Sequence, residues 1–441
     1  KYTTCNLTYQ TPSSKNYLNT YITSLAGQTQ GNGQVVNEKA TIDNSIFIPD
    51  VIFENSNYSN LANDTSYPFT WNAVEKKWTS TNKNNSTTST ITFSPQQSGN
   101  FQVCYTVSSE ANFDKVTFYV DNSQIAQDSG NKSDCVYLGN LSSSNIIKVT
   151  YSKDGGSSSG NDNVMFYMQS GSYNEDIQTL DAGIRYEGKN PNNYIWFNNE
   201  LWRIIGVFDA SSHGQSGQNL VKIIRKDAIG GLAWDSGNVN DWSAASLKAL
   251  LNENYYNATD GTDSGNCYGY STNLQTNCDY TIIGINSAYR PMVKNVTWYL
   301  GGYSSTSATA EAFYGYERGD AVYSGRPTST TGYIGLMYVS DYGYSVLASS
   351  CARTTNLGSY NNSTCAGESW LYGQGYEWTI TPSSVDRAYV FYLRLNNGDL
   401  YIANNTFVYD GNVARPVLYL DPSVYVVDGS GTMSDPYIIG M

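Results

Sequence analysis

The first 45 residues carry one helical pattern followed by a polar stretch. Apolar side chains recur at the three- and four-residue spacing of a single helix face between Ser14, a candidate N-cap, and Gly27. They are Tyr17, Leu18, Tyr21, Ile22 and Leu25. A helix of this length is marginal in water by itself, so we expect it to pack against a neighbouring element. The Gly- and Gln-rich residues that follow predict a linker, and residues 1–45 are interpreted as a lead-in helix and linker.

From residue 46 to residue 172 the pattern changes to short β runs separated by clusters of Asn, Ser and Gly. Val116, Phe118 and Val120 alternate with Thr117 and Tyr119, which places the apolar side chains on one face of a strand. The clearest predicted strands span 89–93, 101–107, 115–120 and 146–151. Because no helical segment separates them, this region predicts a β-sandwich or jelly roll.

Residues 180–441 mix strands with helices and predict a second, larger α+β domain. It opens with a hairpin over 194–205 that turns at Asn198-Asn199, and a later hairpin is indicated by Asn396-Asn397-Gly398. A helix is expected after Asp241 or Ser243, with Leu247, Leu250 and Leu251 on its buried side, and a short one over 307–314. Further strands are predicted over 221–225, 378–381, 388–395 and 400–402.

One set of residues in the first domain resembles the jelly-roll modules of bacterial secreted proteins. In those modules a strand ends in a Tyr-x-Lys-Asp element and runs into a Ser/Gly loop and an Asp. The matching residues are Phe113, Asp114, Lys115 and Val116, then Tyr151, Lys153 and Asp154, then Ser157–Gly160 and Asp162. The match spans about 70 residues and supports the jelly-roll interpretation of residues 46–172.

Nearly the whole second domain resembles a large, poorly characterised family of surface or pilin-like proteins of Gram-positive gut anaerobes. The matching blocks are PNNYIWFNNELWRIIGVFD (191–209), VKIIRKDAIG (221–230), DWSAASLKALLN (241–252), IGLMYVSDYGY (334–344), WTITPSS (378–384) and ARPVLYLDPSVYVVDGSGTMSDPYII (414–439). Their order is also similar to C-type-lectin-like folds and to relatives of the formylglycine-generating enzyme. The resemblance implies a mainly β chain, a jelly roll followed by a C-type-lectin-like domain over 180–441, but no single activity, since such scaffolds serve binding, display and catalysis.

Composition and charge favour an exported protein. Charged residues make up only 14 % of the chain, 39 Tyr and 39 Gly are present, and the formal net charge is −13. This acidity would repel phosphate backbones, so nucleic acid is not an expected partner. No stretch approaches the roughly 20 apolar residues that cross a bilayer. The sequence begins at Lys1, and we expect that a signal or anchor segment has been removed, which would be the only link to membrane or wall.

The seven cysteines predict local disulfides. No CxxC pair is present, which argues against zinc ribbons and thioredoxin-like sites. The simplest pairing is Cys104 with Cys135, Cys267 with Cys278, and Cys351 with Cys365, leaving Cys5 over. Spacing does not fix connectivity, and seven buried free thiols remain the alternative.

Catalysis is disfavoured chiefly by histidine content. His213 is the one histidine, in a Ser/Gly-rich loop where we expect it to be exposed. One histidine is too few for a histidine-rich zinc site, and any catalytic triad would depend on this flexible loop residue as its base. A formylglycine-generating activity would need a redox or metal-binding cysteine pair, whereas these cysteines are explained as loop staples. A carboxylate pair for glycoside hydrolysis is not singled out, and Asp341 and Glu377 are interpreted as structural or surface acids. We therefore predict that the chain is not an enzyme.

Calcium is the one cofactor that the sequence suggests. Calcium takes oxygen ligands, and the jelly-roll loops carry Asp114, Asp154, Asn161 and Asp162 close to backbone carbonyls. The alternative is that Asp154 and Asp162 are turn residues whose carboxylates accept local hydrogen bonds. No spacing reproduces an EF-hand.

Aromatic residues among glycines in the second domain are candidates for sugar binding, since sugars stack on exposed rings beside amides and carboxylates. The candidate ligand-binding residues are Tyr314, Tyr316, Tyr342, Tyr344, Trp370 and Tyr372. The alternative is that the aromatic residues of this region are core residues, which we expect for half or more of them. Trp196, Trp202 and Trp378 lie in predicted strands and are interpreted as packing residues.

These observations predict an extracellular, cell-surface adhesin or pilus-associated protein that binds a host or environmental glycan or protein ligand. Two alternatives stay open. The chain could self-assemble as a structural subunit of a filament or surface layer, with Tyr-rich faces making the contacts. A secreted glycan-active enzyme is the third reading, and it requires a cleft with two converging carboxylates.

Overall fold

The computed structural model describes residues 15–43, 45–156, 160–275, 277–361, 365–371, 375–396 and 399–441. The chain divides into two compact units, one formed by residues up to Ile42 together with Thr179–Met441, and one formed by Asp43–Gln178. The smaller unit is therefore an insertion in the larger one. This differs from a separate lead-in over 1–45, because the contacts of the first helix and strand are made with elements more than a hundred residues later in the chain.

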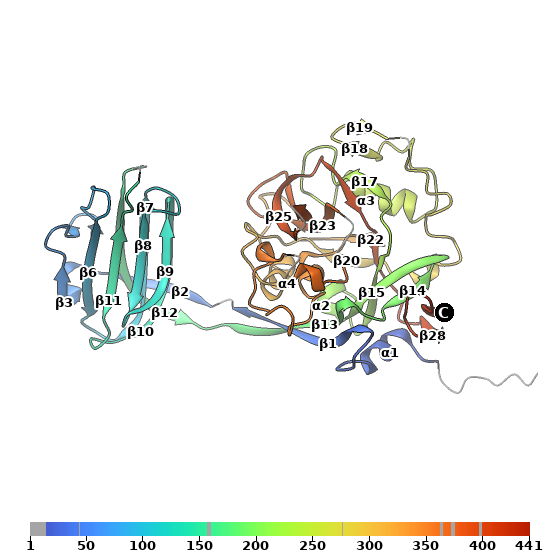
Figure 1. Cartoon of the computed structure of the whole chain (residues 1–441), viewed down its shortest axis with the longest axis horizontal. Helices are drawn as coiled ribbons and strands as arrows, with labels where there is room; N and C mark the ends of the chain where they lie inside the picture. Colours follow the sequence, from blue (N-terminus) through green and yellow to red (C-terminus); the bar gives the residue numbers. More distant parts are fainter. Residues whose placement is uncertain are drawn as a thin grey trace, which may run out of the picture. The chain divides into compact units, whose positions relative to one another are not determined.

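The smaller unit is a β-sandwich of two antiparallel sheets (Figure 1). One sheet has the order β10-β7-β12-β5-β4, with β2 also paired to β12, and the other has the order β3-β6-β11-β8-β9. The strands are β2 (Ile46–Ile52), β3 (Tyr58–Asn63), β4 (Thr70–Asn72), β5 (Lys77–Thr79), β6 (Thr88–Pro95), β7 (Gly99–Ser108), β8 (Lys115–Val120), β9 (Ser123–Ser129), β10 (Asn131–Leu141), β11 (Ile147–Ser152) and β12 (Asn163–Asn174).

The sandwich core follows from the alternation seen in the sequence. Val116 and Phe118 of β8 are fully buried, and in the neighbouring strand Val149 lies opposite Phe118. Phe166 of β12, in the other sheet, packs edge-on against Phe118 with ring centroids 6.5 Å apart. Side chains of both sheets thus share one apolar core, as the period-two pattern requires. The mainly β fold and the predicted sandwich are confirmed.

The larger unit is built on a nine-stranded sheet and a five-stranded sheet. The first has the order β22-β27-β16-β15-β14-β29-β28 and adds β13 and β1 beside β15, and the second has the order β17-β26-β23-β24-β25. Strands of the first are β1 (Asn32–Asp43), β13 (Ile177–Asn190), β14 (Tyr194–Phe197), β15 (Glu200–Phe208), β16 (Leu220–Arg225), β22 (Ile334–Gly335), β27 (Val417–Tyr419), β28 (Tyr425–Asp428) and β29 (Tyr437–Gly440). Strands of the second are β17 (Gly230–Ala233), β23 (Glu377–Pro382), β24 (Tyr389–Asn396), β25 (Asp399–Phe407) and β26 (Gly411–Ala414).

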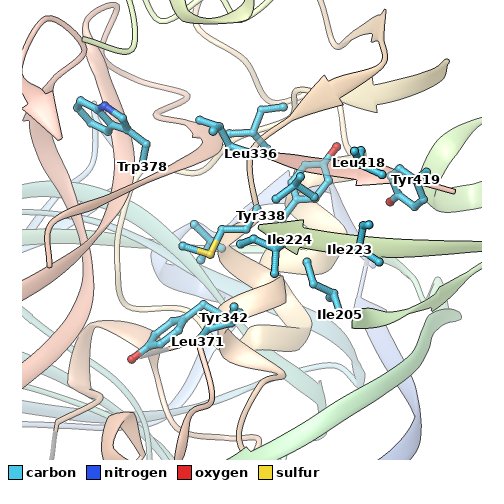
Figure 2. Close-up of a cluster of buried hydrophobic side chains, with 14 of the residues drawn as sticks. Ile205, Ile223, Ile224, Leu336, Tyr338, Tyr342, Leu371, Trp378, Leu418 and Tyr419 are labelled. Atoms are coloured by element: carbon cyan, nitrogen blue, oxygen red, sulfur yellow. The ribbon is translucent and has the colours of Figure 1, made fainter. Parts of the chain in front are cut away.

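Short helices and two small two-stranded sheets complete the larger unit. They are α1 (Leu18–Ser24), α2 (Ala210–His213), α3 (Ser246–Ala249), α4 (Ala310–Arg318), α5 (Val339–Gly343), a π-helical turn (Leu250–Tyr255), 3-10 turns (Arg290–Met292, Leu357–Ser359, Ala366–Glu368) and the pairs β18 (Tyr268–Tyr270) with β19 (Asn273–Leu274) and β20 (Val296–Tyr299) with β21 (Ser329–Gly332). Figure 2 shows part of the core of this unit, which includes Ile223 and Ile224 of β16 and Leu418 and Tyr419 of β27. Ile223 and Leu418 lie opposite each other where the two strands pair.

The lead-in segment is part of this core. Leu18 and Ile22 of α1 are buried, and Leu18 N–H donates to the carbonyl of Val424 at 2.9 Å. The segment expected as a linker continues into β1, which pairs with β13. The helix therefore gains its stability from tertiary contacts, as its short length requires.

The first predicted hairpin has the turn that its sequence indicates. Asn198 and Asn199 take φ values of 57° and 61°, and Phe197 and Glu200 face each other across β14 and β15. Positive φ at both central residues is the requirement of a type I′ turn, and Asn tolerates it better than most residues. In the second predicted hairpin β24 and β25 are present, and Asn397 and Gly398 lie outside the described residues.

The two predicted helices begin later than expected. Asp241 accepts hydrogen bonds from the backbone and hydroxyl of Ser243 in a separate turn, so α3 starts only at Ser246 and runs on as the π-helical turn. The helix predicted over 307–314 is α4, which begins after Thr309 because the Thr309 hydroxyl accepts the backbone N–H of Ala312. The segments before both helices contain several residues that can act as N-caps, so the sequence alone does not determine where each helix begins.

All three expected disulfides are present. Cys104 and Cys135 lie opposite each other on β7 and β10, Cys267 is joined to Cys278, and Cys351 is joined to Cys365. Cys5 lies outside the described residues. Within the described ranges, no helix is long and apolar enough to cross a membrane.

Candidate functional site

The aromatic residues predicted to bind a ligand are mostly core residues, and this prediction is corrected. Tyr314, Tyr342 and Tyr344 are at most 1 % exposed and Trp370 is 5 % exposed. The Tyr314 hydroxyl donates to the carbonyl of Asp181 at 2.6 Å, and the Trp370 indole N–H donates to the carbonyl of Tyr186 at 2.6 Å. Buried rings with satisfied polar atoms have no face to offer a sugar.

The remaining two predicted ligand-binding residues, Tyr316 and Tyr372, do not form a site either. Tyr316 is partly buried and stacks on Tyr303 with ring centroids 4.1 Å apart, and Tyr372 lies outside the described residues. Conversely, Trp202 and Trp378 are buried as expected, but Trp196 is 39 % exposed. Trp196 alternates with Ile195 and Phe197, whose side chains fill the core, so strand geometry turns its indole outward.

The two acids considered for catalysis are both held by buried cations. Asp341 accepts hydrogen bonds from Lys222 and, at 3.0 Å, from Arg185, and Glu377 accepts two from Arg415. Burial raises the pKa of Asp341, but the charges of Lys222 and Arg185 lower it more, so its net pKa lies below the ordinary value. Burial raises the pKa of Glu377, and Arg415 offsets only part of that rise. Both carboxylates act as structural acids in the larger unit.

His213 is buried, which corrects its prediction as an exposed loop residue. Its Nε2 lies 3.0 Å from the carbonyl oxygen of Phe208, and its Nδ1 accepts the backbone N–H of Gln215 at 3.2 Å. This pattern fits a neutral imidazole with the proton on Nε2. Burial lowers the pKa of His213, with a smaller contribution from Arg318. The loop is ordered because it forms the short helix α2, which Asp209 caps.

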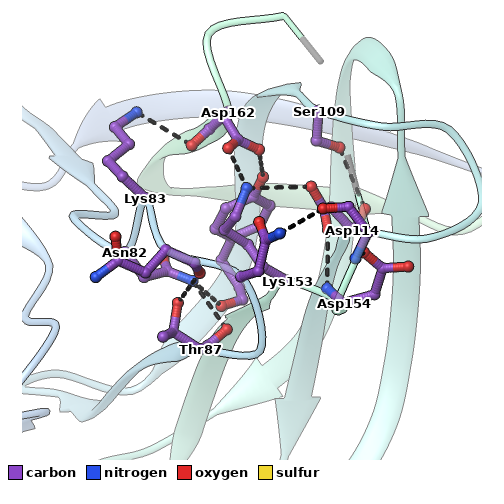
Figure 3. Close-up of polar contacts among 12 residues, drawn as sticks. Asn82, Lys83, Thr87, Ser109, Asp114, Lys153, Asp154 and Asp162 are labelled. Atoms are coloured by element: carbon purple, nitrogen blue, oxygen red, sulfur yellow. Dashed lines mark hydrogen bonds and ion pairs between the residues drawn. The ribbon is translucent and has the colours of Figure 1, made fainter. Parts of the chain in front are cut away.

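The residues predicted to bind calcium surround a lysine instead (Figure 3). The Lys153 ammonium group contacts Asp162 and lies 3.4 Å from Asp114. Asp114 also accepts the backbone N–H of Asp154 at 3.0 Å, and the carboxylate of Asp154 accepts the N–H of Gly156, as in the turn alternative. Across the described ranges, no group of three or more His, Cys, Asp or Glu is arranged to hold a metal. Calcium binding stays a prediction for the experiments below.

A polar hollow of the sandwich is the strongest candidate for a ligand site, and sequence reasoning missed it. Its volume is about 280 Å³, and its lining residues are Asp50, Val51, Phe53, Asn57, Gln96, Gln97, Ser98, Gly99, Asn100, Phe101, Ser170 and Gly171. Gln96, Gln97 and Ser98 form the turn that joins β6 to β7 and are exposed. Phe53 and Phe101 are buried below them and pack edge to face at 5.4 Å. The hollow thus combines amide groups with an apolar floor.

Two asparagines of the hollow are oriented by their own contacts. Asn100 Oδ1 accepts the hydroxyl of Tyr137 at 2.7 Å, and Asn57 Oδ1 accepts the backbone N–H of Glu54 at 2.8 Å. With both oxygens occupied, each side chain keeps its NH2 group as a donor for a ligand. Tyr137 is itself fixed by stacking on Tyr173, with ring centroids 4.0 Å apart.

A second hollow of about 190 Å³ is lined in part by residues that lie between Phe53 and Asn57 in the sequence. Its lining residues are Glu54, Asn55, Ser56, Trp71, Ala73 and Lys76. Trp71 is partly exposed, and Lys76 pairs with Glu54 at 2.8 Å. Residues 50–57 therefore contribute both to an amide-lined hollow and to one that offers an indole and a charge pair. A sequence signal existed only as two polar turns, which look like ordinary hairpin connections.

Comparison with known proteins finds structural similarity over parts of the chain. No family model matches it, and no curated protein matches it. Among solved structures it is similar to the secreted serine protease VesC from Vibrio cholerae, with 17 % identity and a TM-score of 0.22, over 27 % of this chain and 25 % of the protease. The chain thus matches about a quarter of that protein's length.

Two carbohydrate-binding modules are also similar to part of the chain. A family 61 module solved with β-1,4-galactotriose has 10 % identity and a TM-score of 0.17, over 28 % of this chain and 91 % of the module. A family 35 module from Paenibacillus barcinonensis has 13 % identity and a TM-score of 0.16, over 28 % of this chain and 96 % of the module. At these TM-scores the likeness carries no argument about function.

Proposed function

We propose that the smaller unit binds carbohydrate in the hollow lined by Gln96, Gln97 and Asn100, and that the chain serves adhesion at the cell surface. The observation that carries the proposal is the combination of amides and one carboxylate, Asp50, over the Phe53–Phe101 floor. Sugar hydroxyls need partners that donate and accept, which amides do, and sugar C–H groups need apolar surface. In the described structure, the side chains of Gln96 and Gln97 have no intramolecular hydrogen bond, so binding would not break one.

The hollow suits binding better than catalysis. Asp50 is the single carboxylic acid among the twelve residues that line it in the described part of the chain. Glycoside hydrolysis ordinarily uses two carboxyl groups about 5–9 Å apart on either side of the scissile bond. A glycan-active enzyme therefore remains the third reading, and it would need a second acid brought by a change of conformation.

The extracellular setting rests on different observations. Three disulfides are typical of proteins that work in oxidising compartments. The larger unit carries the sequence blocks that resemble surface and pilin-like proteins with C-type-lectin-like domains, and in this proposal it provides the display function. The ligand would be a host or environmental glycan.

A glycan array, with and without calcium, tests this proposal. We expect binding by the wild-type chain, and a loss of about 5- to 10-fold in affinity in Gln97→Ala or Asn100→Ala, since one net hydrogen bond contributes about 1 kcal/mol. Gln124→Ala is the matched control because Gln124 is exposed on β9 and does not line the hollow. Flat signals across the array, or equal affinities in all three variants, would contradict the proposal. Binding that requires calcium would support the prediction of a calcium site.

Self-assembly is the second candidate function, and strand β2 favours it. This strand pairs with β12 on one side, and no partner on its other side occurs among the described strands. Its exposed aliphatic residues are Ile46, Ile48, Val51 and Ile52, with exposed fractions of 54, 50, 48 and 41 %. An edge strand with exposed aliphatic side chains is a site for pairing with another chain. We expect a second copy of this chain as the partner.

Light scattering and electron microscopy of the purified protein test the assembly. We expect concentration-dependent oligomers that are lost in the double variant Ile48→Lys/Val51→Lys. Val74→Lys is the control, because Val74 is 92 % exposed in the turn between β4 and β5 and is not part of β2. A strict monomer at all concentrations would remove this candidate.

A further inference from the structure

We propose that Lys153 and Asp162 become joined by an intramolecular isopeptide bond, formed inside the sandwich with Asp114 as the proton-transfer group. The three side chains meet where β11 ends and the loop before β12 returns. The Lys153 ammonium group is in contact with Asp162, and Asp114 Oδ2 lies 3.4 Å from it on the other side. The amine, the carboxyl carbon and an acid–base group are therefore adjacent, as an intramolecular condensation needs.

Burial supports the reaction. The side chains of Lys153 and Asp114 are each 1 % exposed, and that of Asp162 is 10 % exposed. One ammonium group and two carboxyl groups are therefore held together away from bulk water, and a second ammonium group, that of Lys83, lies 3.1 Å from the backbone carbonyl of Asp162. The same exclusion of water protects an amide, once formed, from hydrolysis.

Neighbouring groups hold the electrophile. The Tyr151 hydroxyl donates to Asp162 Oδ1 at 3.3 Å, and burial raises the pKa of Tyr151, so this donor stays protonated. A fixed donor at that oxygen would stabilise the negative charge that develops on it during attack. Lys83 Nζ donates to the backbone carbonyls of Asn161 and Asp162 at 2.7 and 3.1 Å, which fixes the loop. Asp162 has a φ of 56°, a conformation that needs such support.

The condensation balances without any other reagent. Lys153 Nζ loses one proton to Asp114, which passes it to an oxygen of Asp162, and the neutral amine then attacks the carboxyl carbon of Asp162 to form the C–N bond. The nitrogen then loses its second proton to Asp114, which delivers it to the same oxygen as the C–O bond at Asp162 breaks, so that this oxygen leaves as water. One ammonium group and one carboxylate give one amide and one water molecule, with no change in net charge and no oxidant.

A second buried lysine provides an internal comparison. Lys222 contacts Asp341 as Lys153 contacts Asp162, and both side chains are 1 % exposed. The third group there is the guanidinium of Arg185, which holds Asp341 as an ionised, unreactive carboxylate and offers no proton relay. We expect no bond between Lys222 and Asp341.

Mass spectrometry of the full, reduced chain decides between these outcomes. We expect a mass lower than the sequence value by one water molecule. A protease that cleaves before aspartate separates Lys153 from Asp154, so the bond would appear as two peptides joined through Lys153 and Asp162. An unmodified mass would overturn the proposal. So would a water loss that maps to a succinimide at Asp154-Gly155, or to Lys222 and Asp341.

Variants test the role of Asp114. Lys153→Arg and Asp114→Asn should restore the full sequence mass, and Lys148→Arg, on the same strand and partly exposed, should keep the water loss. Persistence of the joined peptides in Asp114→Asn would contradict the proton-transfer role. The peptide map of the wild-type chain remains decisive if a variant does not fold.

Discussion

Arg415 donates two hydrogen bonds to the carboxylate of Glu377, from Nε to Oε1 at 2.7 Å and from Nη2 to Oε2 at 2.9 Å. The two side chains are 3 % and 1 % exposed. Glu377 begins β23 and pairs with Val413 of β26, two residues before Arg415. The ion pair thus ties two strands of the five-stranded sheet at one end.

Breaking one side of this pair should be costly. Glu377→Gln leaves the guanidinium buried without its counter-charge, and we expect a loss of about 3–5 kcal/mol in the free energy of unfolding of the larger unit. Glu54→Gln is the control, since the exposed pair Glu54–Lys76 should contribute at most about 1 kcal/mol. Denaturant unfolding followed by tryptophan fluorescence measures both. Similar losses of stability in the two variants would mean that burial does not determine how much each ion pair contributes to the free energy of unfolding.

His213 should make stability depend on pH. Burial lowers the pKa of His213 below its ordinary 6.5, so the unfolded chain binds a proton at a higher pH than the folded chain. Stability is therefore full above pH 6.5 and falls as the pH drops through the folded pKa, by at most about 1.4 kcal/mol per pH unit. The physical reason is that Nδ1, which accepts the Gln215 N–H, would have to be protonated.

This dependence can be isolated because the chain has one histidine. The stability difference between wild type and His213→Gln should shrink as the pH is lowered from 7 to 5. The single imidazole resonance in NMR should titrate with a midpoint below 6.5. A difference that stays constant with pH, or a midpoint above 6.5, would contradict the buried neutral imidazole.

The two residues of the type I′ turn should respond in opposite directions to glycine. Asn198 is 6 % exposed, donates to the carbonyl of Gly284 at 3.0 Å and accepts the N–H of Asn286 at 2.7 Å, so Asn198→Gly should cost about 1–3 kcal/mol. Asn199 has one exposed contact, from the Tyr289 hydroxyl at 3.2 Å, and glycine relieves its positive φ. We expect Asn199→Gly to be neutral or stabilising. Thermal unfolding of both variants checks this, and equal losses would show that the backbone alone matters.

The disulfide of the larger unit between Cys351 and Cys365 should stabilise it by restricting the unfolded chain. For a loop of this length the expected contribution is about 3 kcal/mol. Cys351→Ser/Cys365→Ser should therefore lower the melting temperature of the larger unit. The matched pair Cys104→Ser/Cys135→Ser should instead affect the sandwich, because that disulfide joins β7 to β10. Calorimetry resolves the two units if each melts separately, and a shift of the wrong transition would contradict the assignment.

Local features of this fold were readable from the sequence, and features that depend on distant contacts were not. The Asn198-Asn199 turn, the strand alternation around Phe118 and the disulfides between close cysteines are decided within a few residues or a few tens of residues. The insertion was not visible, because nothing near Ile42 or Thr179 signals that the two segments belong to one unit.

The same distinction explains the site predictions. Tyr314 and Tyr342 were interpreted as surface aromatics because glycines flank them, yet burial is set by strands that arrive from elsewhere in the chain. His213 is buried, not exposed as predicted, for the same reason. The hollow of the sandwich combines residues from segments around positions 50, 97 and 170, and none of these segments is distinctive alone.

The pairing of the first helix with the last strands has a consequence for how the chain folds as it is made. Tyr17 forms a β-bridge with Tyr425, and the carbonyl of Asn16 accepts the N–H of Val426 at 2.9 Å. Synthesis runs from the N-terminus, so α1 emerges before β28 and must wait for this strand before its apolar face is fully covered. The sandwich, whose partners are all contained within Asp43–Gln178, can be completed in the meantime. The first helix is thus made before the strands that cover it, and it reaches its final contacts after the sandwich can already be complete.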